Sequence, residues 1–510
     1  MQTLHSAQEA ACWLHSRVTG ELRTDSRLVQ KGDGFIAWPG AATDGRRYLA
    51  QALAQGATAC LMEQAALSPW LEALQDPELE ALACMADLKA QTALVADAYY
   101  EHPSHALQVL AVTGTNGKTS TAWWLAQALS SPTLQKVCGL VGTLGVGRLP
   151  NLMTTGMTTP DPVLLQRQFW QFAADGVTHC AVEASSIGLA EHRLDGTHIR
   201  VAVFTNFTQD HLDYHGDMAR YWSAKAALFA WPGLQAAVIN IDDAQGALLS
   251  KQLQDGPIEV WTCSRRGPAR LQARALLGSQ GLTFEVIEGG NVQTLHTSLI
   301  GEYNIDNLLG VIGSLRALGF VLAQAVQACA QLTAVPGRME RVTFDLPDAQ
   351  ANSPCPLVIV DYAHTPDAIT QALVALRSQA TVRGGRLWCV LGCGGDRDAS
   401  KRPLMAAAAE SAADQLVLTS DNPRSESPEA IVAAMVQGLS RPQSVRIQLD
   451  RALAIADAVT QSAAQDVVLV AGKGHECEQE ILGVRHPFSD VTQARRVLQQ
   501  RALQRTGVHA

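Results

Sequence analysis

The chain has 510 residues, of which 47% are hydrophobic and 17% are charged. This composition excludes disorder over most of the chain, because there is enough apolar surface to offset the entropy lost on folding. The net charge of −9 (39 basic against 48 acidic residues) disfavours a broad nucleic-acid-binding surface, which usually carries positive charge. At about 100–200 residues per domain, the length predicts about three domains.

The start of the chain, MQTLHSAQEAACWLHSR, has no continuous apolar segment, so we expect no signal peptide. No run approaches the ~20 apolar residues that a membrane helix needs, so we expect no membrane span. The 11 cysteines form no Cys-x-x-Cys pair, which favours free thiols in a reducing compartment. These features predict a cytoplasmic protein.

Three α/β blocks are predicted in chain order, at residues 1–106, 107–336 and 337–510. The first and smallest contains ATDGRRYLAQALAQGATACLME, which predicts a helix followed by a short strand. The second opens with the apolar run 107–112 and ends at Pro336–Gly337, a plausible hinge. We expect the third to be Rossmann-like.

The second and third blocks alternate short apolar runs with helical patterns. Examples are HCAVEAS, IRVAVFTNF, AAVIN, LVIVDYA, RLWCVLGCGG, QLVLTSDNP and DVVLVAGKG. This alternation predicts parallel sheets covered by helices. Ligands of such sheets bind at the carboxyl ends of the strands, so candidate site residues should directly follow these runs.

A phosphate-binding loop is predicted between the first strand and first helix of the second block. It comprises Gly114, Thr115, Asn116, Gly117, Lys118, Thr119 and Ser120. Glycines and a helix N-terminus present backbone N–H groups to phosphate, Lys118 can reach the outer phosphates, and the Thr119 hydroxyl can bind Mg²⁺. Small or apolar residues at 122, 125, 126 and 129 predict one buried helix face. The strict P-loop pattern is not met, because Val112 stands where it requires glycine. A plain glycine turn with a solvated lysine is the alternative.

The segment TGTNGKTS (113–120), after an apolar strand, resembles the nucleotide loop of the Mur ligases and folylpolyglutamate synthetases. These are three-domain, ATP-dependent, amide-forming enzymes, and the resemblance extends over nearly the whole chain. It implies a central P-loop-type ATPase domain, an N-terminal UDP-binding domain and a C-terminal amino-acid-binding domain.

Three further motifs match the catalytic centre of this family, at Glu183 in VEASS, His211 in NFTQDHLDYHG and Lys225 in YWSAKA. The resemblance implies that Glu183 and Thr119 bind one Mg²⁺, that His211 helps to hold a second, and that CO₂ carbamylates Lys225 to N6-carboxylysine, a further metal ligand. Taken singly, a Glu or His after a strand is more often a cap or loop residue. A zinc pair of His211 and His215 is disfavoured, because His215–Gly216 reads as a turn.

Other motifs resemble the family's substrate contacts. For the sugar-peptide UDP-MurNAc-L-Ala-D-Glu the resemblance implies Ser26 (in Asp25-Ser26-Arg27), Thr158, Thr159, Ser185, Glu191 and Arg193. Hydroxyls and an Arg suit diphosphate and carboxylate groups. Many members have His at 187 and Gln at 191. Ile187 therefore receives no role, and Glu191 would repel an anionic substrate unless it is paired or turned away.

The last block carries Asp421-Asn422-Pro423-Arg424, which resembles the members that add meso-diaminopimelate. Arg424 could pair with the second carboxylate of that diamino acid, which lysine lacks, so lysine would leave a buried cation unpaired. Arg397, Gly472 and Glu476 complete the implied amino-acid pocket. On the ATP side the family pattern implies Asn304, Asn307, Arg338 and the segment 361–364. A surface Asx-Pro turn is the alternative for 421–424 alone.

The resemblance therefore implies a monomeric ligase of peptidoglycan biosynthesis that uses ATP and Mg²⁺ to join meso-diaminopimelate to the sugar-peptide. The alternatives are the same ligase adding L-lysine, a folylpolyglutamate synthetase, a P-loop ATPase without ligase activity, and a nucleotide-binding protein without catalysis. The third usually needs a ring or a nucleic-acid surface, and intact Lys118, Glu183, His211 and Lys225 argue against the last.

Overall fold

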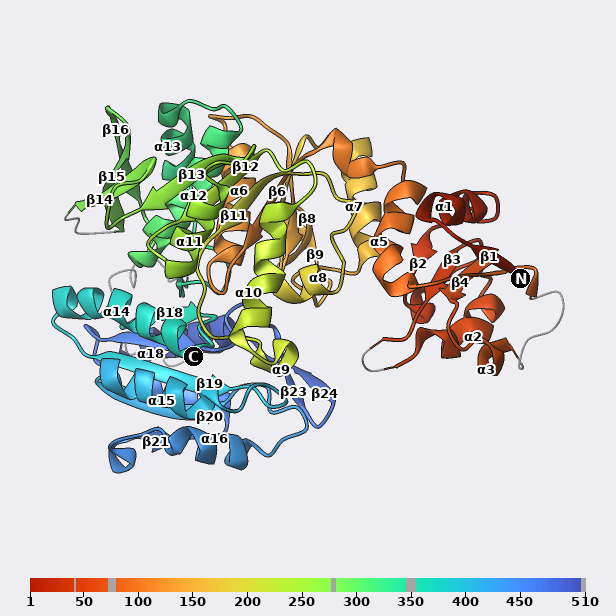
Figure 1. Ribbon diagram of the computed structural model, residues 1–510. Coiled ribbons are helices and arrows are strands. Elements are labelled where there is room, and N and C mark those ends of the chain that lie inside the picture. Colours follow the sequence, from red (N-terminus) through yellow and green to blue (C-terminus); the bar gives the residue numbers. More distant parts are fainter. Residues whose placement is uncertain (41–42, 72–78, 277–280, 345–354, 506–510) are drawn as a thin grey trace.

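The structure is a computed structural model that describes residues 1–40, 43–71, 79–276, 281–344 and 355–505. Three large sheets follow one another along the chain, and Figure 1 shows the N-terminal and C-terminal lobes next to the central one. Each sheet is wholly or mainly parallel and is covered by helices. The predicted α/β class with three domains is therefore confirmed.

The N-terminal sheet has five parallel strands in the order β1-β5-β4-β3-β2. Its strands are β1 (Gln2–Leu4), β2 (Leu22–Arg23), β3 (Gly34–Ala37), β4 (Ala59–Glu63) and β5 (Leu82–Met85). Its α-helices are α1 (Ala7–His15), α2 (Leu49–Ala54), α3 (Ser68–Leu71) and α5 (Leu88–Tyr99). Helices α1 and α5 pack together, and α5 also packs against α7 (Pro162–Ala174) of the central domain.

The central sheet has 11 strands in the order β16-β15-β14-β13-β12-β11-β6-β10-β7-β8-β9. The parallel strands are β6 (Gln108–Thr113), β7 (Cys138–Gly142), β10 (His179–Glu183), β11 (Ile199–Phe204), β12 (Ala236–Asn240), β13 (Glu259–Ser264) and β14 (Leu271–Leu276). Antiparallel strands extend both edges, namely β8 (Gly145–Arg148), β9 (Asn151–Met153), β15 (Leu282–Glu288) and β16 (Asn291–Thr297).

Helices bury both faces of the central sheet. One face packs against α6 (Lys118–Leu129), α12 (Tyr303–Ala317) and α13 (Leu322–Ala330), and the other against α7 and α11 (Ala244–Leu253). Strand β6 is apolar along its length because both of its faces are buried. Leu110 and Val112 point into the core on the α6 face, whereas Val109 and Ala111 point into the core on the α7 face. The predicted buried face of α6 is confirmed at 122, 125, 126 and 129. Short helices α8 (Ser186–Ala190), α9 (Leu212–His215) and α10 (Met218–Ala226) follow β10 and β11.

The C-terminal sheet has the order β17-β18-β22-β19-β20-β21, with only β17 antiparallel. Its strands are β17 (Glu340–Arg341), β18 (Leu357–Asp361), β19 (Leu387–Cys393), β20 (Gln415–Ser420), β21 (Arg446–Ile447) and β22 (Val467–Ala471). Its helices are α14 (Pro366–Arg383), α15 (Lys401–Ala412), α16 (Pro428–Val436), α17 (Arg451–Gln461) and α18 (Asp490–Arg505). A hairpin of β23 (Glu478–Ile481) and β24 (Val484–Pro487) lies beside the sheet.

The carboxyl ends of central strands β6, β10 and β11 face loops of the C-terminal domain. Asp210, after β11, lies 3.7 Å from His364 and 3.4 Å from Lys401 across this boundary. On the other side, Thr24 of the N-terminal domain donates to Asp161, which caps α7, at 3.2 Å. The described residues include no helix with both the length and the apolarity to cross a membrane.

Candidate active site

The loop after β6 has the tight geometry expected of a phosphate-binding loop. Gly114 (φ +144°) and Gly117 (φ +86°) adopt conformations that favour glycine. An added Cβ would lie 1.9 Å from the Thr205 hydroxyl at Gly114 and 2.3 Å from the Asn307 amide oxygen at Gly117. No other residue fits at either position without displacing a neighbour.

Two residues that directly follow β11 form hydrogen bonds with the backbone of this loop. Asn206 accepts from the N–H groups of Thr115 (2.8 Å) and Asn116 (2.9 Å), and the Thr205 hydroxyl donates to the Asn116 carbonyl at 2.6 Å. Sequence reasoning assigned no role to Thr205 or Asn206. The only signal was their position directly after an apolar run.

Glu183 lies at the end of β10 and is 1% exposed. Its carboxylate accepts from the hydroxyls of Thr119 (2.9 Å) and Thr143 (3.1 Å) and from the Thr143 N–H (2.8 Å). Burial raises its pKa, and the Thr143 N–H and Lys118 oppose that rise. The structure thus brings together the predicted pair of Thr119 and Glu183 and adds Thr143, which follows β7 in the same way.

Two lysines converge on one backbone oxygen. The Gly114 carbonyl accepts from Lys118 Nζ at 2.8 Å and from Lys225 Nζ at 2.7 Å. Lys225 is 1% exposed, and its Nζ lies 4.5 Å from the centre of the Tyr221 ring. Burial, and then the neighbouring Lys118, hold the pKa of Lys225 well below its usual range. No carboxylate of the described residues forms an ion pair with it.

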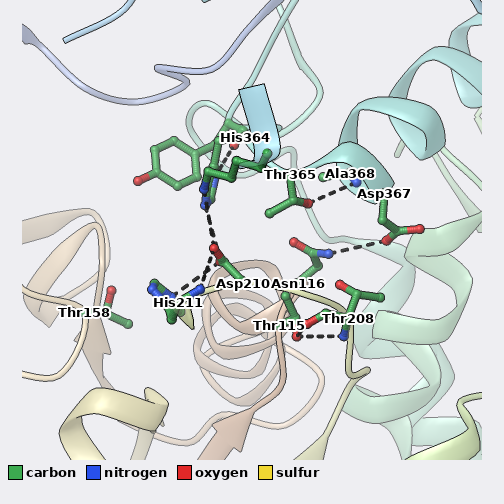
Figure 2. Close-up of polar contacts among 12 residues, drawn as sticks. Thr115, Asn116, Thr158, Thr208, Asp210, His211, His364, Thr365, Asp367 and Ala368 are labelled. Carbon is green, nitrogen blue, oxygen red and sulfur yellow. Dashed lines mark hydrogen bonds and ion pairs between the residues drawn. The ribbon is translucent and has the colours of Figure 1, made fainter. Parts of the chain in front are cut away.

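His211 and Asp210 form the edge of this centre nearest to the C-terminal domain, and Figure 2 shows Asp210 between His211 and His364. His211 Nε2 lies 3.5 Å from Asp210, and burial lowers the pKa of His211 below its ordinary value. Burial alone would raise the pKa of Asp210, but His364, His211 and Lys401 hold it below the usual range. His215 does not join His211; its Nε2 lies 3.1 Å from the Ser186 hydroxyl.

Two hydrogen bonds attach the C-terminal domain to the phosphate loop. Asn116 Nδ2 donates to Asp367 at 3.5 Å (Figure 2), and Arg338 Nη2 donates to the Thr119 hydroxyl at 3.5 Å. The Arg338 guanidinium also stacks on the Tyr362 ring, 4.2 Å from its centre. Arg338, predicted on the ATP side, thus lies beside the loop.

The two predicted adenine-side asparagines lie behind the loop. Asn307 donates to the Asn304 side-chain oxygen at 2.9 Å, and Asn304 donates to the Ile300 carbonyl at 2.7 Å. Both are buried. Asn307 lies directly against Gly117, and Asn304 holds the Asn307 side chain in place.

Most of the predicted sugar-peptide residues form one connected group next to Glu183. The Thr158 hydroxyl lies 3.0 Å from that of Thr143, and the Thr159 hydroxyl donates to the Glu183 carbonyl at 2.6 Å. Ser185 lies 3.0 Å from the Thr159 hydroxyl, and Arg193 donates to the Thr159 carbonyl at 2.8 Å.

Two predicted sugar-peptide residues are placed differently. Ser26 lies in the N-terminal domain, where its hydroxyl donates to the Gln51 side-chain oxygen at 3.4 Å. Glu191 is paired, with Lys89 Nζ at 2.6 Å and the Tyr214 hydroxyl at 2.5 Å.

The residues predicted to bind the amino-acid substrate lie on the loops after β20 and β22, and hydrogen bonds join the two loops. Asn422 Nδ2 donates to Glu476 at 2.7 Å, and the buried Lys473 Nζ donates to Asn422 Oδ1 (3.0 Å) and to Glu476 (2.9 Å). Gly472 passes so close to Asp421 that a Cβ would lie 2.6 Å from its carboxylate. Sequence reasoning missed Lys473, although it stands between two predicted residues.

Arg424 and Arg397 flank this group. Arg424 has φ +53°, and its Nη1 donates to the Gly395 carbonyl at 2.7 Å. Gly395 lies against Pro423, where a Cβ would meet the proline carbonyl at 1.9 Å. Arg397 is exposed and donates to the Asp396 carbonyl at 3.0 Å. The loop that carries Arg397 continues to Lys401, which reaches Asp210, so the amino-acid group lies on the loops that meet the phosphate site.

Three family models match the chain along its length. They are described as "Mur ligase family, catalytic domain" (residues 20–111), "Mur ligase middle domain" (112–315) and "Mur ligase, glutamate ligase domain" (337–474).

Relatives and solved structures agree with these models. The UDP-N-acetylmuramoyl-L-alanyl-D-glutamate--2,6-diaminopimelate ligase of Acidovorax sp. (strain JS42) is 57% identical over 507 residues, covering 98% of this chain and 99% of that protein. The ligase of the same name from Pseudomonas aeruginosa is 43% identical and covers 94% of each. A solved structure of a ligase with that name is 36% identical, with a TM-score of 0.62 over 94% of this chain and 95% of that one.

A folylpolyglutamate synthase from Mycobacterium tuberculosis shares the fold alone, at 20% identity and a TM-score of 0.61, over 82% of this chain and 96% of that one. The three family models and the close relatives together identify this chain as a member of the Mur ligase family.

Proposed function

We propose that this chain is an ATP-dependent ligase that adds meso-2,6-diaminopimelate to UDP-MurNAc-L-Ala-D-Glu, a step in peptidoglycan biosynthesis. The relatives named above carry that activity in their names over nearly the full chain. The single observation that carries the proposal is the meeting of the loop bearing Arg397 and Lys401 with the phosphate site at Asp210. Both halves of an amide-forming reaction thereby face one centre.

Mg²⁺ fits the oxygen-rich side of the centre. The buried Glu183 carboxylate and the Thr119 hydroxyl are hard oxygen donors, and they are already within 2.9 Å of each other. They would hold one ion, and His211 with a carbamylated Lys225 would hold a second. When bound, Mg²⁺ offsets the charge that builds up on the phosphates.

Carbamylation of Lys225 is supported by its surroundings. Two ammonium groups on one carbonyl oxygen repel each other, so the neutral amine of Lys225 is favoured in this buried position. A neutral amine can attack CO₂, and loss of a proton then gives an N-carboxylate anion. The product would replace the repulsion between Lys225 and Lys118 by attraction.

The reaction proceeds in two steps. A side-chain carboxylate oxygen of the D-glutamate attacks the γ-phosphorus of ATP, and ADP leaves. The neutral amine of diaminopimelate then attacks the acyl carbon, and phosphate leaves with the former carboxylate oxygen. Lys118 stabilises charge on the transferred phosphoryl group, and Arg338 lies on the same side of the loop.

The remaining residues bind and orient the substrates. Gly114–Ser120, Asn304 and Arg338 bind ATP; Ser26, Thr158, Thr159, Ser185 and Arg193 bind the sugar-peptide; Arg397, Asp421–Arg424, Gly472 and Glu476 bind the amino acid. With domain limits at 1–106, 107–336 and 337–510, the ATP set would lie on the central domain together with Arg338 of the C-terminal domain. The sugar-peptide set would lie on the N-terminal and central domains, and the amino-acid set on the C-terminal domain. Eight of the eleven thiols are buried and all are free, in keeping with a cytoplasmic location.

The test is phosphate release from ATP by the purified protein with UDP-MurNAc-L-Ala-D-Glu and meso-diaminopimelate, L-lysine or no amino acid. Of the three conditions, we expect phosphate release only in the one that contains meso-diaminopimelate. The rate should exceed that with L-lysine by a factor of up to about 10⁴. The variant Arg424→Ala should lose most of that discrimination, whereas Arg485→Ala, on the exposed hairpin, should keep it. Equal turnover with lysine would refute the proposed amino acid, and turnover with no amino acid would favour the plain ATPase.

A further inference from the structure

Glu191 is the one acidic residue in the proposed sugar-peptide group, and an ion pair between domains neutralises it. Its Oε2 lies 2.6 Å from Lys89 Nζ of the N-terminal domain, and its Oε1 accepts from the Tyr214 hydroxyl at 2.5 Å. Burial alone would raise the pKa of Glu191, but Lys89 and Tyr214 hold it below the usual value. Glu191 is therefore an anion whose two oxygens are both engaged within the protein.

The placement of Lys89 is unfavourable for its own helix. Lys89 is the second residue of α5, where a positive charge opposes the helix dipole; the carboxylates at this helix end belong to the N-cap Asp87 and to Glu63, which accepts from the Leu88 N–H at 2.8 Å. Glu191 is likewise the C-cap of α8, where a negative charge is disfavoured. The negative charge at the end of α8 is thus better explained by the ion pair with Lys89 than by the helix.

The surroundings of the pair connect it to the substrate group. Helix α8 begins after the N-cap Ser185. It packs closely on Thr159, as shown by Gly188, where an added Cβ would lie 2.7 Å from the Thr159 Cβ. Arg193, two residues after Glu191, donates to the Thr159 carbonyl. Without Lys89, the Glu191 carboxylate would present its charge beside residues that face a diphosphate and carboxylates.

Resting on the proposed function, we propose that Lys89 is a positioning residue of the sugar-peptide site. Its ammonium cancels the charge of Glu191, so that the pocket does not repel an anionic substrate, and it fastens α5 of the N-terminal domain to the end of α8. Lys89 is 40% exposed and Glu191 is 21% exposed, so neither substitution removes a core contact.

The test varies UDP-MurNAc-L-Ala-D-Glu at saturating ATP and meso-diaminopimelate with the full-length enzyme. Lys89→Met should raise the KM for the sugar-peptide about threefold to tenfold, as expected for one unscreened charge near the surface, with kcat and both other KM values nearly unchanged. Lys89→Arg should behave like the wild type. The double variant Lys89→Met/Glu191→Gln should recover a nearly wild-type KM, because the unpaired charge is gone.

Lys136→Met is the matched control, since Lys136 is exposed at the amino-terminal end of β7, away from the carboxyl ends where the site lies. An unchanged KM in Lys89→Met, or no recovery in the double variant, would overturn the proposal. Calorimetric titration of the wild type with the sugar-peptide separates the two hypotheses: a wild-type enzyme that neither binds nor consumes it would refute the proposed function itself.

Discussion

At the scale of single residues, two lysines lie close together in a buried position where their positive charges repel each other. The Gly114 carbonyl binds Lys118 and Lys225 together, and no carboxylate of the described chain pairs with Lys225. Such perturbed groups cluster at functional sites. The proposed carbamate at Lys225 would replace the repulsion between the two ammonium groups by attraction.

Lys225 is therefore expected to show a carbamate carbon resonance in ¹³C NMR after equilibration with ¹³C-bicarbonate. Lys225→Ala should lose that resonance and reduce kcat by about 100-fold or more, because a charged group at the reacting phosphates is lost. Lys136→Ala is the control and should keep both. Full activity of Lys225→Ala, or a resonance that survives the substitution, would contradict this assignment.

At the scale of elements, the carboxyl ends of strands in two sheets carry nearly all of the site. Arg451, at the start of α17, is 1% exposed and donates to the carbonyls of Ser420 (3.1 Å) and Ala471 (2.9 Å), the last residues of β20 and β22. Asp490, at the start of α18, pairs with it at 2.7 Å. This buried pair fixes the strand ends from which the amino-acid loops emerge.

Arg451→Met should lower the free energy of unfolding of the protein by about 3–5 kcal/mol, because Asp490 is left buried without its partner. Arg485→Met removes an exposed pair with Glu478 (3.0 Å) and should cost about 1 kcal/mol or less. Denaturant unfolding curves measure both. Similar losses in the two variants would show that the buried pair does not hold these strands.

The sequence predicted these elements because parallel strands and glycine loops have local signatures. The apolar runs, the loop at 114–117 and the residues after each strand are recognisable from the local sequence alone, without knowing which distant residues they contact. Thr143 and the Lys89–Glu191 pair could not be predicted, because each acts through a residue far away in the chain. Lys473 lies three residues from its partner Glu476, but its bond to Asn422 joins two distant loops. The Glu191–Lys89 distance of 2.6 Å joins positions about 100 residues apart, and no periodicity encodes such a contact.

At the scale of the whole molecule, Asp210 is one of the residues through which the central domain meets the C-terminal one, by way of His364 and Lys401. Asp210→Asn should weaken this contact, because the neutral amide attracts neither cation. In solution scattering, the wild type should contract on adding an ATP analogue and both substrates, and Asp210→Asn should contract less. The control Asp213→Asn, exposed on α9, should match the wild type. Identical scattering curves for Asp210→Asn and the wild type would show that the Asp210 contact does not drive the contraction.

Stability should fall as the solution is acidified below pH 6.5. Burial lowers the pKa of His179 to about 4 and of His475 to about 3, so both stay neutral in the folded protein while the unfolded chain binds protons near pH 6.5. The unfolded state then binds more protons than the native state, and acid favours it. His179→Gln should remove roughly 1–3 kcal/mol of the stability lost between pH 6.5 and 4.5. The exposed His5→Gln is the control, and a slope unchanged by His179→Gln would contradict the assignment.

The central claim is that ATP activates a carboxylate which an amine then captures at one shared centre. Its most direct test uses sugar-peptide with ¹⁸O in the D-glutamate side-chain carboxylate, incubated with the enzyme, ATP and meso-diaminopimelate, followed by mass analysis of the phosphate. The account predicts one ¹⁸O atom in each phosphate released and an amide-linked diaminopimelate product. Phosphate that carries no ¹⁸O would contradict it.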